Sequence, residues 1–155
     1  MKRPTFYSEC LEALRYCKCD VIMSVGSQKT MDTLKNIPSH IQVEISVPQL
    51  TVLQNADIFI THCGMNSVHE SIYLGVPMIL FPQQSEQQIV ANRLSEMGMG
   101  ILLKELSQKA IQESIKYVWD NKKSMQEKLK KLATTFKIAG GAKRAADVIE
   151  NSVLR

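Results

Sequence analysis

The chain has 155 residues, a length typical of a single domain. Hydrophobic residues make up 45% of it and charged residues 22%, close to the averages of globular proteins, which excludes collagen-like, disordered and extended coiled-coil chains. The 19 basic and 15 acidic residues leave a formal net charge of +4. No apolar run approaches the roughly 20 residues of a membrane-spanning helix, and the first residues form no signal-peptide core. We therefore expect one cytoplasmic domain over residues 1–155.

Short apolar runs alternate with amphipathic segments along the chain, which is the pattern of a parallel sheet covered by helices. The apolar runs predict five strands, at residues 20–25, 41–45, 57–61, 77–81 and 100–103. The amphipathic segments predict six helices, at residues 5–16, 66–74, 85–97, 107–121, 124–138 and 142–152, with Gly75, Gly98 and Gly140 as C-terminal stops. The fold class is therefore α/β, with an open parallel sheet of five strands flanked by helices.

The start of the chain departs from this pattern. A doubly wound domain normally opens with a strand and the turn that faces its ligand. This chain instead reads Met-Lys-Arg-Pro and enters the first predicted helix at once. The sequence thus leaves open that the first strand of the fold is missing.

The four cysteines do not predict a disulfide framework. Cys10, Cys17, Cys19 and Cys63 are too few and too unevenly spaced for one in a chain of this length, so we expect free thiols. One residue separates Cys17 from Cys19, which is not the spacing of a zinc site, and no second Cys or His pair accompanies them. We expect no metal at these residues.

The basic excess lies in the last third of the chain. Its lysines alternate at helical spacing with Met125, Leu129, Leu132 and Phe136, as on the solvated face of an amphipathic helix. This pattern favours a surface helix over a nucleic-acid-binding surface.

Polar loops follow the predicted strands. In open α/β sheets, ligands bind outside the carboxyl ends of the strands. The four informative loops here are residues 26–28, 46–49, 62–67 and 82–87, all of them polar and all containing Gly or Pro. We therefore expect the ligand site to be built from these loops.

The loop at residues 62–67 is the strongest candidate, because it runs from a strand through Gly64 directly into a helix. A helix start presents backbone N–H groups and a positive dipole end, which stabilise phosphate oxygens. Asn66 and Ser67 would add donors there, and His62 a further hydrogen bond or charge. An equally good alternative is a capping box formed by Ser67 and Glu70, which needs no ligand. His62 and His69 lack a third metal ligand, so no metal is expected here either.

Several of these residues together resemble the donor-binding motif of family 1 glycosyltransferases. The similar segments are Val47-Pro48-Gln49, residues 56–71 (Ala-Asp-Ile-Phe-Ile-Thr-His-Cys-Gly-Met-Asn-Ser-Val-His-Glu-Ser), residues 75–82 (Gly-Val-Pro-Met-Ile-Leu-Phe-Pro), Glu86-Gln87 and Asn92-Arg93. The resemblance is close over residues 47–100 and looser over residues 4–147. It is greatest to bacterial macrolide-type enzymes and extends to plant and animal UDP-glycosyltransferases.

The resemblance implies a UDP-sugar site. In the family, the residue at Val47 offers backbone hydrogen bonds to uracil, and the residue at His62 contacts the diphosphate. Glu70 would bind the ribose hydroxyls and Glu86-Gln87 the sugar hydroxyls. Ser46 and Met65 stand where plant members carry Trp, which removes a base-stacking ring and one sugar contact. The implied donor-binding residues are Val47, Gln49, His62, Gly64, Asn66, Ser67, Glu70, Glu86 and Gln87.

The resemblance also implies a fold and a reaction. The family's GT-B fold has two facing Rossmann-like halves, and this chain corresponds to the C-terminal, nucleotide-sugar-binding half without the N-terminal acceptor domain. Family members invert the anomeric centre, transferring a hexose to an acceptor hydroxyl that a His of the other half deprotonates. No catalytic residue, metal or cofactor is therefore expected here, UDP-sugar being the donor substrate. Two alternatives stay open, a donor-binding subunit that needs a separate acceptor-binding partner and an inactive truncated domain.

Overall fold

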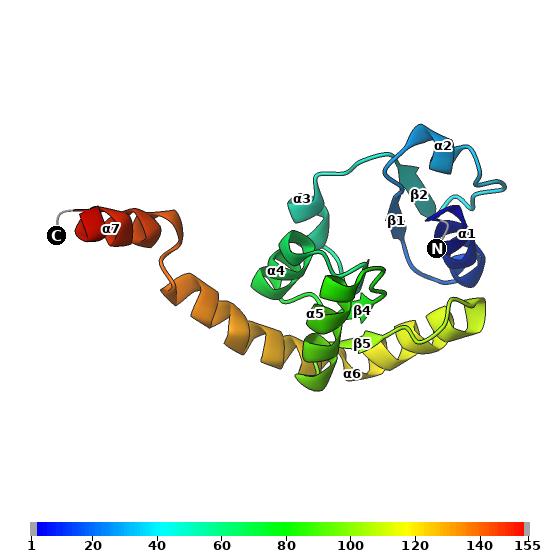
Figure 1. Cartoon of the computed structure of the whole chain (residues 1–155). Coiled ribbons are helices and arrows are strands. Elements are labelled where there is room, and N and C mark those ends of the chain that lie inside the picture. Colours follow the sequence, from blue (N-terminus) through cyan, green and yellow to red (C-terminus); the bar gives the residue numbers. More distant parts are fainter. Residues whose placement is uncertain (1–2, 154–155) are drawn as a thin grey trace.

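The computed structural model describes residues 3–153 of the chain. Helices and strands alternate along it, as the apolar periodicity predicts (Figure 1). In chain order the elements are α1 (Arg3–Leu14), β1 (Val21–Ser24), α2 (Gln28–Met31), β2 (Ile41–Glu44), α3 (Gln49–Leu53), β3 (Phe59–Thr61), α4 (Met65–Leu74), β4 (Met78–Leu80), α5 (Ser85–Glu96), β5 (Gly100–Leu102), α6 (Gln108–Ile138) and α7 (Gly141–Val153).

The strands form two parallel sheets flanked by helices. β1 pairs with β2 in one sheet, and the other has the order β3-β4-β5. The α/β class with parallel strands is thus confirmed, but the expectation of a single five-stranded sheet is wrong, because no ladder joins β1 to β3 within residues 3–153. Pairing requires neighbouring backbones about 4.8 Å apart. Apolar runs predict strands but carry no information on which strand edges come that close.

Two apolar clusters meet at β4. Met78, Ile79 and Leu80 are all fully buried, as expected of a parallel strand covered on both faces. Ile79 belongs to a cluster with residues of α1, β1, β2 and the first half of α6. Met78 and Leu80 belong to a second cluster with residues of α4, α5 and the second half of α6. The long helix α6 therefore supports both sheets.

The helix α6 is continuous over 31 residues, whereas the sequence predicts two helices, at residues 107–121 and 124–138. The Ser107 hydroxyl caps its start by accepting a hydrogen bond from the Ala110 N–H at 3.2 Å. No Gly or Pro lies between residues 121 and 124, so nothing in the backbone ends the helix there. The Asn121 amide donates to the Tyr117 carbonyl one turn earlier, at 2.8 Å, without interrupting it.

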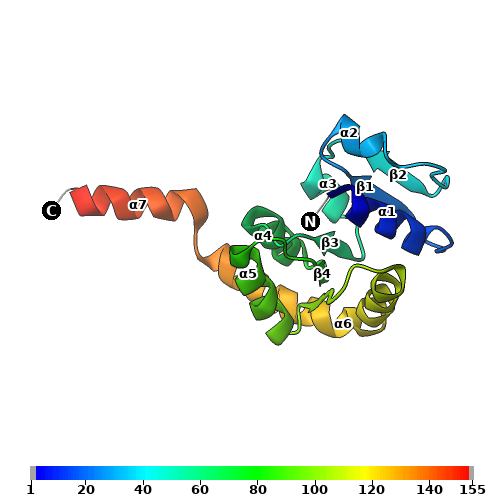
Figure 2. The same ribbon diagram turned by 45° about the vertical axis from the view of Figure 1, so that its right-hand side comes forward.

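The glycine at the end of α4 and the last helix of the chain lie where the sequence predicts them. Gly75 ends α4 in the left-handed conformation, with φ of 73°, as a C-terminal stop should. The helix predicted at residues 142–152 is α7, which extends away from the sheets and is almost wholly exposed (Figures 1 and 2). Among the helices of residues 3–153, none is long and apolar enough to cross a membrane.

The expectation of four free thiols is wrong for the two cysteines in the turn after α1. Cys17 and Cys19 form a disulfide, their Cα atoms lying 5.4 Å apart within disulfide reach. Cys10 and Cys63 are free and buried.

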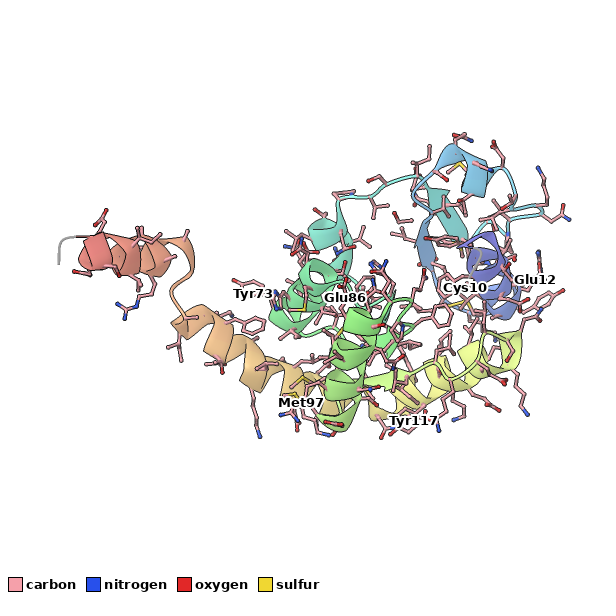
Figure 3. All side chains as sticks on the ribbon, viewed as in Figure 1. Cys10, Glu12, Tyr73, Glu86, Met97 and Tyr117 are labelled. Atoms are coloured by element: carbon pink, nitrogen blue, oxygen red, sulfur yellow. A yellow bond between two sulfur atoms is a disulfide. The ribbon has the colours of Figure 1, made fainter. Side chains whose placement is uncertain are left out.

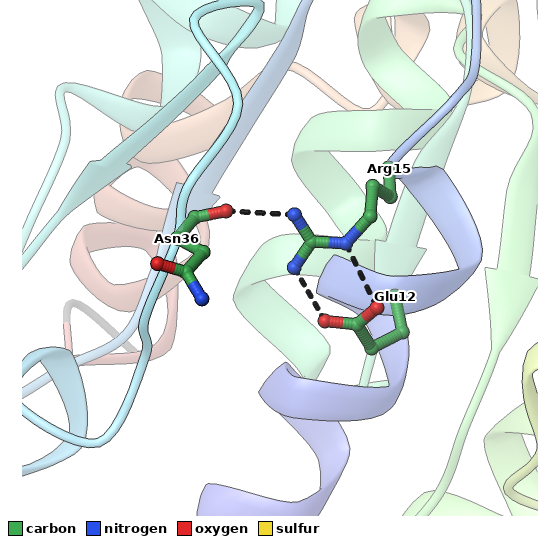
Figure 4. A network of polar contacts seen from close by, with 3 residues as sticks. All are labelled: Glu12, Arg15 and Asn36. Carbon is green, nitrogen blue, oxygen red and sulfur yellow. Dashed lines mark hydrogen bonds and ion pairs between the residues drawn. The ribbon is translucent and has the colours of Figure 1, made fainter.

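Arg15 ties the C-terminal end of α1 to the segment before β2. It donates to the Glu12 carboxylate and, at 2.7 Å, to the Asn36 carbonyl (Figure 4). The hydrogen bonds from Arg15 hold the pKa of Glu12 below its usual value.

Candidate functional site

The loops after β2 and β3 meet at the carboxyl ends of the strands. Gln49, the first residue of α3, donates from Nε2 to the Ser67 hydroxyl at 3.1 Å and to Glu70 Oε2 at 2.5 Å. The three side chains are partly buried and come from segments 18 and 21 residues apart. The structure therefore brings together three of the residues that the sequence selects, and we call them the Gln49 cluster.

The start of α4 decides between the two interpretations of Ser67 and Glu70. The helix begins at Met65 after an N-cap at Gly64, and no side chain caps it. A capping box needs its Ser at the N-cap and its Glu three residues further on, but Ser67 is the third residue of α4 and Glu70 the sixth. The capping-box alternative is therefore wrong. Within residues 3–153 no side chain caps the N–H groups of this first turn, which lies at the carboxyl edge of the sheet.

The turn from β3 into α4 depends on Cys63. This residue has φ of 68°, in the left-handed region, and is 1% exposed. Its N–H donates to the Thr61 hydroxyl at 3.2 Å, which holds the turn. Burial raises the pKa of the Cys63 thiol to about 11, opposed by a backbone hydrogen bond from Phe81. A buried thiol with a raised pKa is a poor nucleophile, and the contacts of Cys63 assign it a role in shaping the turn.

His62 is exposed and lies against Gly64. A Cβ built on Gly64 would be 2.9 Å from His62 Nε2, closer than real Cβ atoms approach. Only glycine therefore leaves the imidazole its position beside the first turn of α4. Asn66, the second residue of the helix, is also exposed there, and Val47 lies half-buried in the loop before α3.

Glu86 and Gln87 lie in the first turn of α5, after the neighbouring strand β4. Figure 3 labels Glu86 there. The Phe81 N–H donates to the Thr61 carbonyl at 2.8 Å, so the loops after β3 and β4 start side by side. Gln87 Oε1 accepts a hydrogen bond from the Gln83 N–H at 2.9 Å, and Glu86 is exposed. In the described part of the chain no hydrogen bond or ion pair links this pair to the Gln49 cluster.

The site offers binding groups rather than a reactive centre. Uncapped N–H groups suit an anion, while the amide and carboxylate of the Gln49 cluster suit hydroxyl groups. Residues 3–153 contain no group of three or more His, Cys, Asp or Glu side chains that could hold a metal ion. The contacts of Gln49 with Ser67 and Glu70 are the feature that sequence reasoning missed, and no local signal points to a pairing over 18 to 21 residues.

Comparisons with known proteins agree on one family. A family model described as "Erythromycin biosynthesis protein CIII-like, C-terminal domain" matches residues 8–138. The NDP-glycosyltransferase YjiC of Bacillus subtilis (strain 168) is 41% identical over 149 residues, which cover 95% of this chain and 38% of that protein. The chain thus spans less than two-fifths of that relative's length.

Solved structures resemble the fold over nearly the whole chain. The calicheamicin glycosyltransferase CalG4 is 26% identical, with a TM-score of 0.86, over 96% of this chain and 39% of that one. A UDP-glucose: anthocyanidin 3-O-glucosyltransferase in complex with UDP is 25% identical, with a TM-score of 0.79, over 93% of this chain and 35% of that one. Both similarities therefore cover one part of a longer protein.

Proposed function

The chain belongs to the family of Erythromycin biosynthesis protein CIII-like C-terminal domains, a glycosyltransferase family with the GT-B fold, and from this premise we propose that it is a UDP-sugar-binding half. Its partner is an acceptor-binding N-terminal domain, either in the same polypeptide or in a partner subunit. Together the two halves transfer a hexose to a hydroxyl of a small-molecule acceptor. The relative named as a glucosyltransferase in complex with UDP supports the choice of nucleotide.

The observation that carries the proposal is the Gln49 cluster beside the uncapped start of α4. The diphosphate accepts hydrogen bonds from the first-turn N–H groups of α4 and from the side chains of Asn66 and Ser67. His62, held beside Gly64, supplies one more donor. The ribose hydroxyls donate to Glu70, which Gln49 keeps oriented through its amide. These groups match a ribose diphosphate in charge and hydrogen-bonding capacity.

The two ends of the donor extend from this centre. Val47 contacts the uracil through its backbone, and Ser46 leaves the base without an aromatic stacking partner. Glu86 and Gln87 bind the sugar hydroxyls from the first turn of α5, one strand further along the sheet. Gln87 Nε2 remains available for this role while its Oε1 holds the Gln83 N–H.

The reaction we propose inverts the anomeric carbon without a metal ion. The acceptor oxygen forms a bond to that carbon from the face opposite UDP, and the bond between the carbon and the UDP oxygen breaks. The acceptor's proton passes to a base on the other half. The charge that develops on UDP is stabilised by the α4 N–H groups and His62, because fixed donors aimed at a developing anion lower its energy.

A titration with UDP tests the site. Glu70→Ala removes the acceptor of the ribose hydroxyls, and the expected loss of UDP affinity is about 10- to 100-fold, since hydrogen bonds to charged groups contribute roughly 1.5–3 kcal/mol. Glu96→Ala, which removes an exposed carboxylate at the end of α5, is the matched control and should bind UDP as the wild type does. Calorimetry gives both affinities. An unchanged affinity in Glu70→Ala, with the fold intact, would contradict the proposed site.

A further inference from the structure

The disulfide between Cys17 and Cys19 lies in the turn that joins α1 to β1, and the proposed function does not use it. Cys19 is exposed and Cys17 is half-buried. The Val21 N–H, at the start of β1, donates to the His40 carbonyl at 2.9 Å, which places the turn at the amino ends of β1 and β2. The disulfide therefore lies at the end of the strands opposite the Gln49 cluster.

The loop that this disulfide closes is very small, because only Lys18 separates the two cysteines. In the chain-entropy account, a disulfide stabilises a fold by restricting the unfolded chain, and the effect grows with the length of the closed loop. A loop with one intervening residue restricts the unfolded chain little. Stabilisation of the fold is therefore a poor explanation for this bond.

Hydrogen bonds that involve no sulfur hold the chain on both sides of the disulfide. Before it, the Cys17 N–H donates to the Leu14 carbonyl at 3.0 Å, and Arg15 Nη1 donates to the Asn36 carbonyl at 2.7 Å. After it, the hydrogen bond from the Val21 N–H fixes the start of β1. The two cysteines are thus kept near each other whether or not their sulfurs are bonded. The bond can open and close again while the fold stays in place.

The other two thiols of the chain are unsuited to opening this disulfide. Cys10 and Cys63 are buried, and burial holds the pKa of each thiol well above its ordinary value. The thiolate is the form that attacks a disulfide, and a buried thiol with a raised pKa seldom supplies it. The attacking thiol must therefore come from another molecule.

We propose that Cys17 and Cys19 form a thiol–disulfide exchange site that reacts with an external dithiol. Structural disulfides resist reduction, whereas exposed ones are the labile, regulatory or catalytic ones. The exposure of Cys19, the short loop and the independent hydrogen bonds around the turn place this disulfide in the second group. The proposal does not rest on the proposed function.

The exchange moves two electrons in two steps. A thiolate of the dithiol forms a bond to the sulfur of Cys19, the exposed residue of the pair, and the bond between Cys17 and Cys19 breaks with Cys17 leaving as a thiolate. The second thiolate of the dithiol then bonds to the first, and Cys19 leaves as a thiolate. The dithiol is oxidised to a disulfide, the pair is reduced, and the two protons of the dithiol end on Cys17 and Cys19.

The test counts the reactive thiols of the full, folded chain. Dithiothreitol is the probe dithiol, oxidised glutathione is the probe oxidant, and iodoacetamide traps free thiols for mass spectrometry. Starting from the chain treated with oxidised glutathione, we expect about 1 mM dithiothreitol to raise the number of trapped thiols from none to two without urea. Oxidised glutathione should then return the number to none. Cys10 and Cys63 should stay untrapped throughout because they are buried.

Two matched variants test which sulfur the external thiol reaches. Cys17→Ser leaves the exposed Cys19, and Cys19→Ser leaves the half-buried Cys17. Oxidised glutathione should form a mixed disulfide at least about tenfold faster with Cys17→Ser than with Cys19→Ser. Urea unfolding checks that both variants fold. Equal rates in two folded variants would contradict attack at Cys19.

Three results would overturn the proposal as a whole. In the first, the pair stays oxidised in dithiothreitol until urea unfolds the chain, which is the behaviour of a structural disulfide. In the second, reduction itself unfolds the chain, as measured by far-UV circular dichroism, which shows that the bond braces the fold. In the third, two thiols remain trapped even after treatment with oxidised glutathione, so that the pair does not cycle.

Discussion

Gly64 is the residue on which the arrangement of the site depends most directly. It has no side chain, and the His62 ring occupies the space that a Cβ would need. Its φ of −62° and ψ of 138° are open to any residue, so the requirement is one of space and not of backbone conformation. A substitution here therefore moves the imidazole and leaves the helix in place.

We expect Gly64→Ala to weaken UDP binding by about 2- to 10-fold, the effect of losing one hydrogen bond of roughly 0.5–1.5 kcal/mol. The free energy of unfolding should change by less than about 1 kcal/mol, since only an exposed ring has to move. Calorimetry and urea unfolding measure the two quantities. Met65→Ala, an exposed change in the same turn, is the control for stability. Unaltered UDP affinity in both Gly64→Ala and His62→Ala would show that the ring makes no contact with the ligand.

The two buried thiols predict how stability depends on pH. Burial, and to a lesser extent the Glu9 carboxylate, raises the pKa of Cys10 to about 12, and burial raises the pKa of Cys63 to about 11, from an ordinary value of 9.0. Both thiols hold their protons more tightly in the folded state. Their stabilising contribution is complete below pH 9 and is lost as pH rises toward these values.

We therefore expect the free energy of unfolding to fall as the pH rises from 9 to about 11. The fall should be less steep in Cys10→Ala, which has one thiol fewer to ionise on unfolding. Urea unfolding of both proteins across this range gives the two slopes, and the other groups that titrate there are common to both. Parallel curves would mean that the Cys10 thiol ionises as easily in the folded chain as in the unfolded one.

At the scale of elements, α6 connects the two clusters of the core. Leu129 of this helix is fully buried in the second cluster, below α4 and β4. We expect Leu129→Ala to lower the free energy of unfolding by about 2–5 kcal/mol, because a large side chain leaves a cavity in a packed core. Lys131→Ala, on the exposed side of the same turn, should stay within about 0.5 kcal/mol of wild type. Urea unfolding compares them, and equal effects would refute the assignment of this face to the core.

The first turn of α5 carries the proposed sugar contacts. Replacing both Glu86 and Gln87 by Ala should weaken binding of UDP-glucose more than binding of UDP, because these residues lie one strand beyond the Gln49 cluster. Stability should fall by about 0.5–1.5 kcal/mol, since the Gln83 N–H loses its partner. Calorimetry with the two ligands on one protein preparation makes the comparison. Equal losses for UDP and UDP-glucose would place the pair at the nucleotide instead.

At the scale of the molecule, the proposed function places the catalytic base on another half, and the positions of the histidines bear on that proposal. The His40 ring is held at the Leu14 carbonyl near the start of β2, at the opposite edge from the site. The His69 ring packs edge-on against Phe136, with 5.2 Å between the centroids. Of the three histidines, only His62 lies at the proposed site, where the proposed function has it contact the diphosphate. A transfer reaction needs a base within hydrogen-bond reach of the acceptor and a site closed to water.

The 155-residue chain on its own should therefore form no glycoside from UDP-glucose and a panel of phenolic, macrolide and sterol acceptors, beyond slow release of free sugar. Chromatography of the reaction mixture with mass detection measures both products. Addition of an acceptor-binding half should restore transfer. Rapid glycoside formation by the chain alone would contradict the assignment of the base to another half.

The sequence predicted those features that depend on local pattern. Periodicity placed each of the five strands within a few residues of its observed position, and Gly75 as the end of α4, because amphipathic spacing and left-handed glycines act within a few residues. The order of the elements then placed the loops after β2, β3 and β4 at one edge, since parallel strands share their carboxyl ends. This order predicted the candidate loops. The roles proposed for single residues in these loops came from the resemblance to family 1 glycosyltransferases.

Other features of the fold and the site depend on how segments that are distant in the sequence pack, and only the tertiary structure decided them. The separation into two sheets and the hydrogen bonds from Gln49 to Ser67 and Glu70 have no local signal. The N-cap at Gly64 excluded the capping box, although Ser67 and Glu70 have its spacing. The Gln49 contacts depend on distances of a few ångströms between side chains of α3 and α4, which are set by how these helices pack at the ends of the strands and not by the residue types themselves.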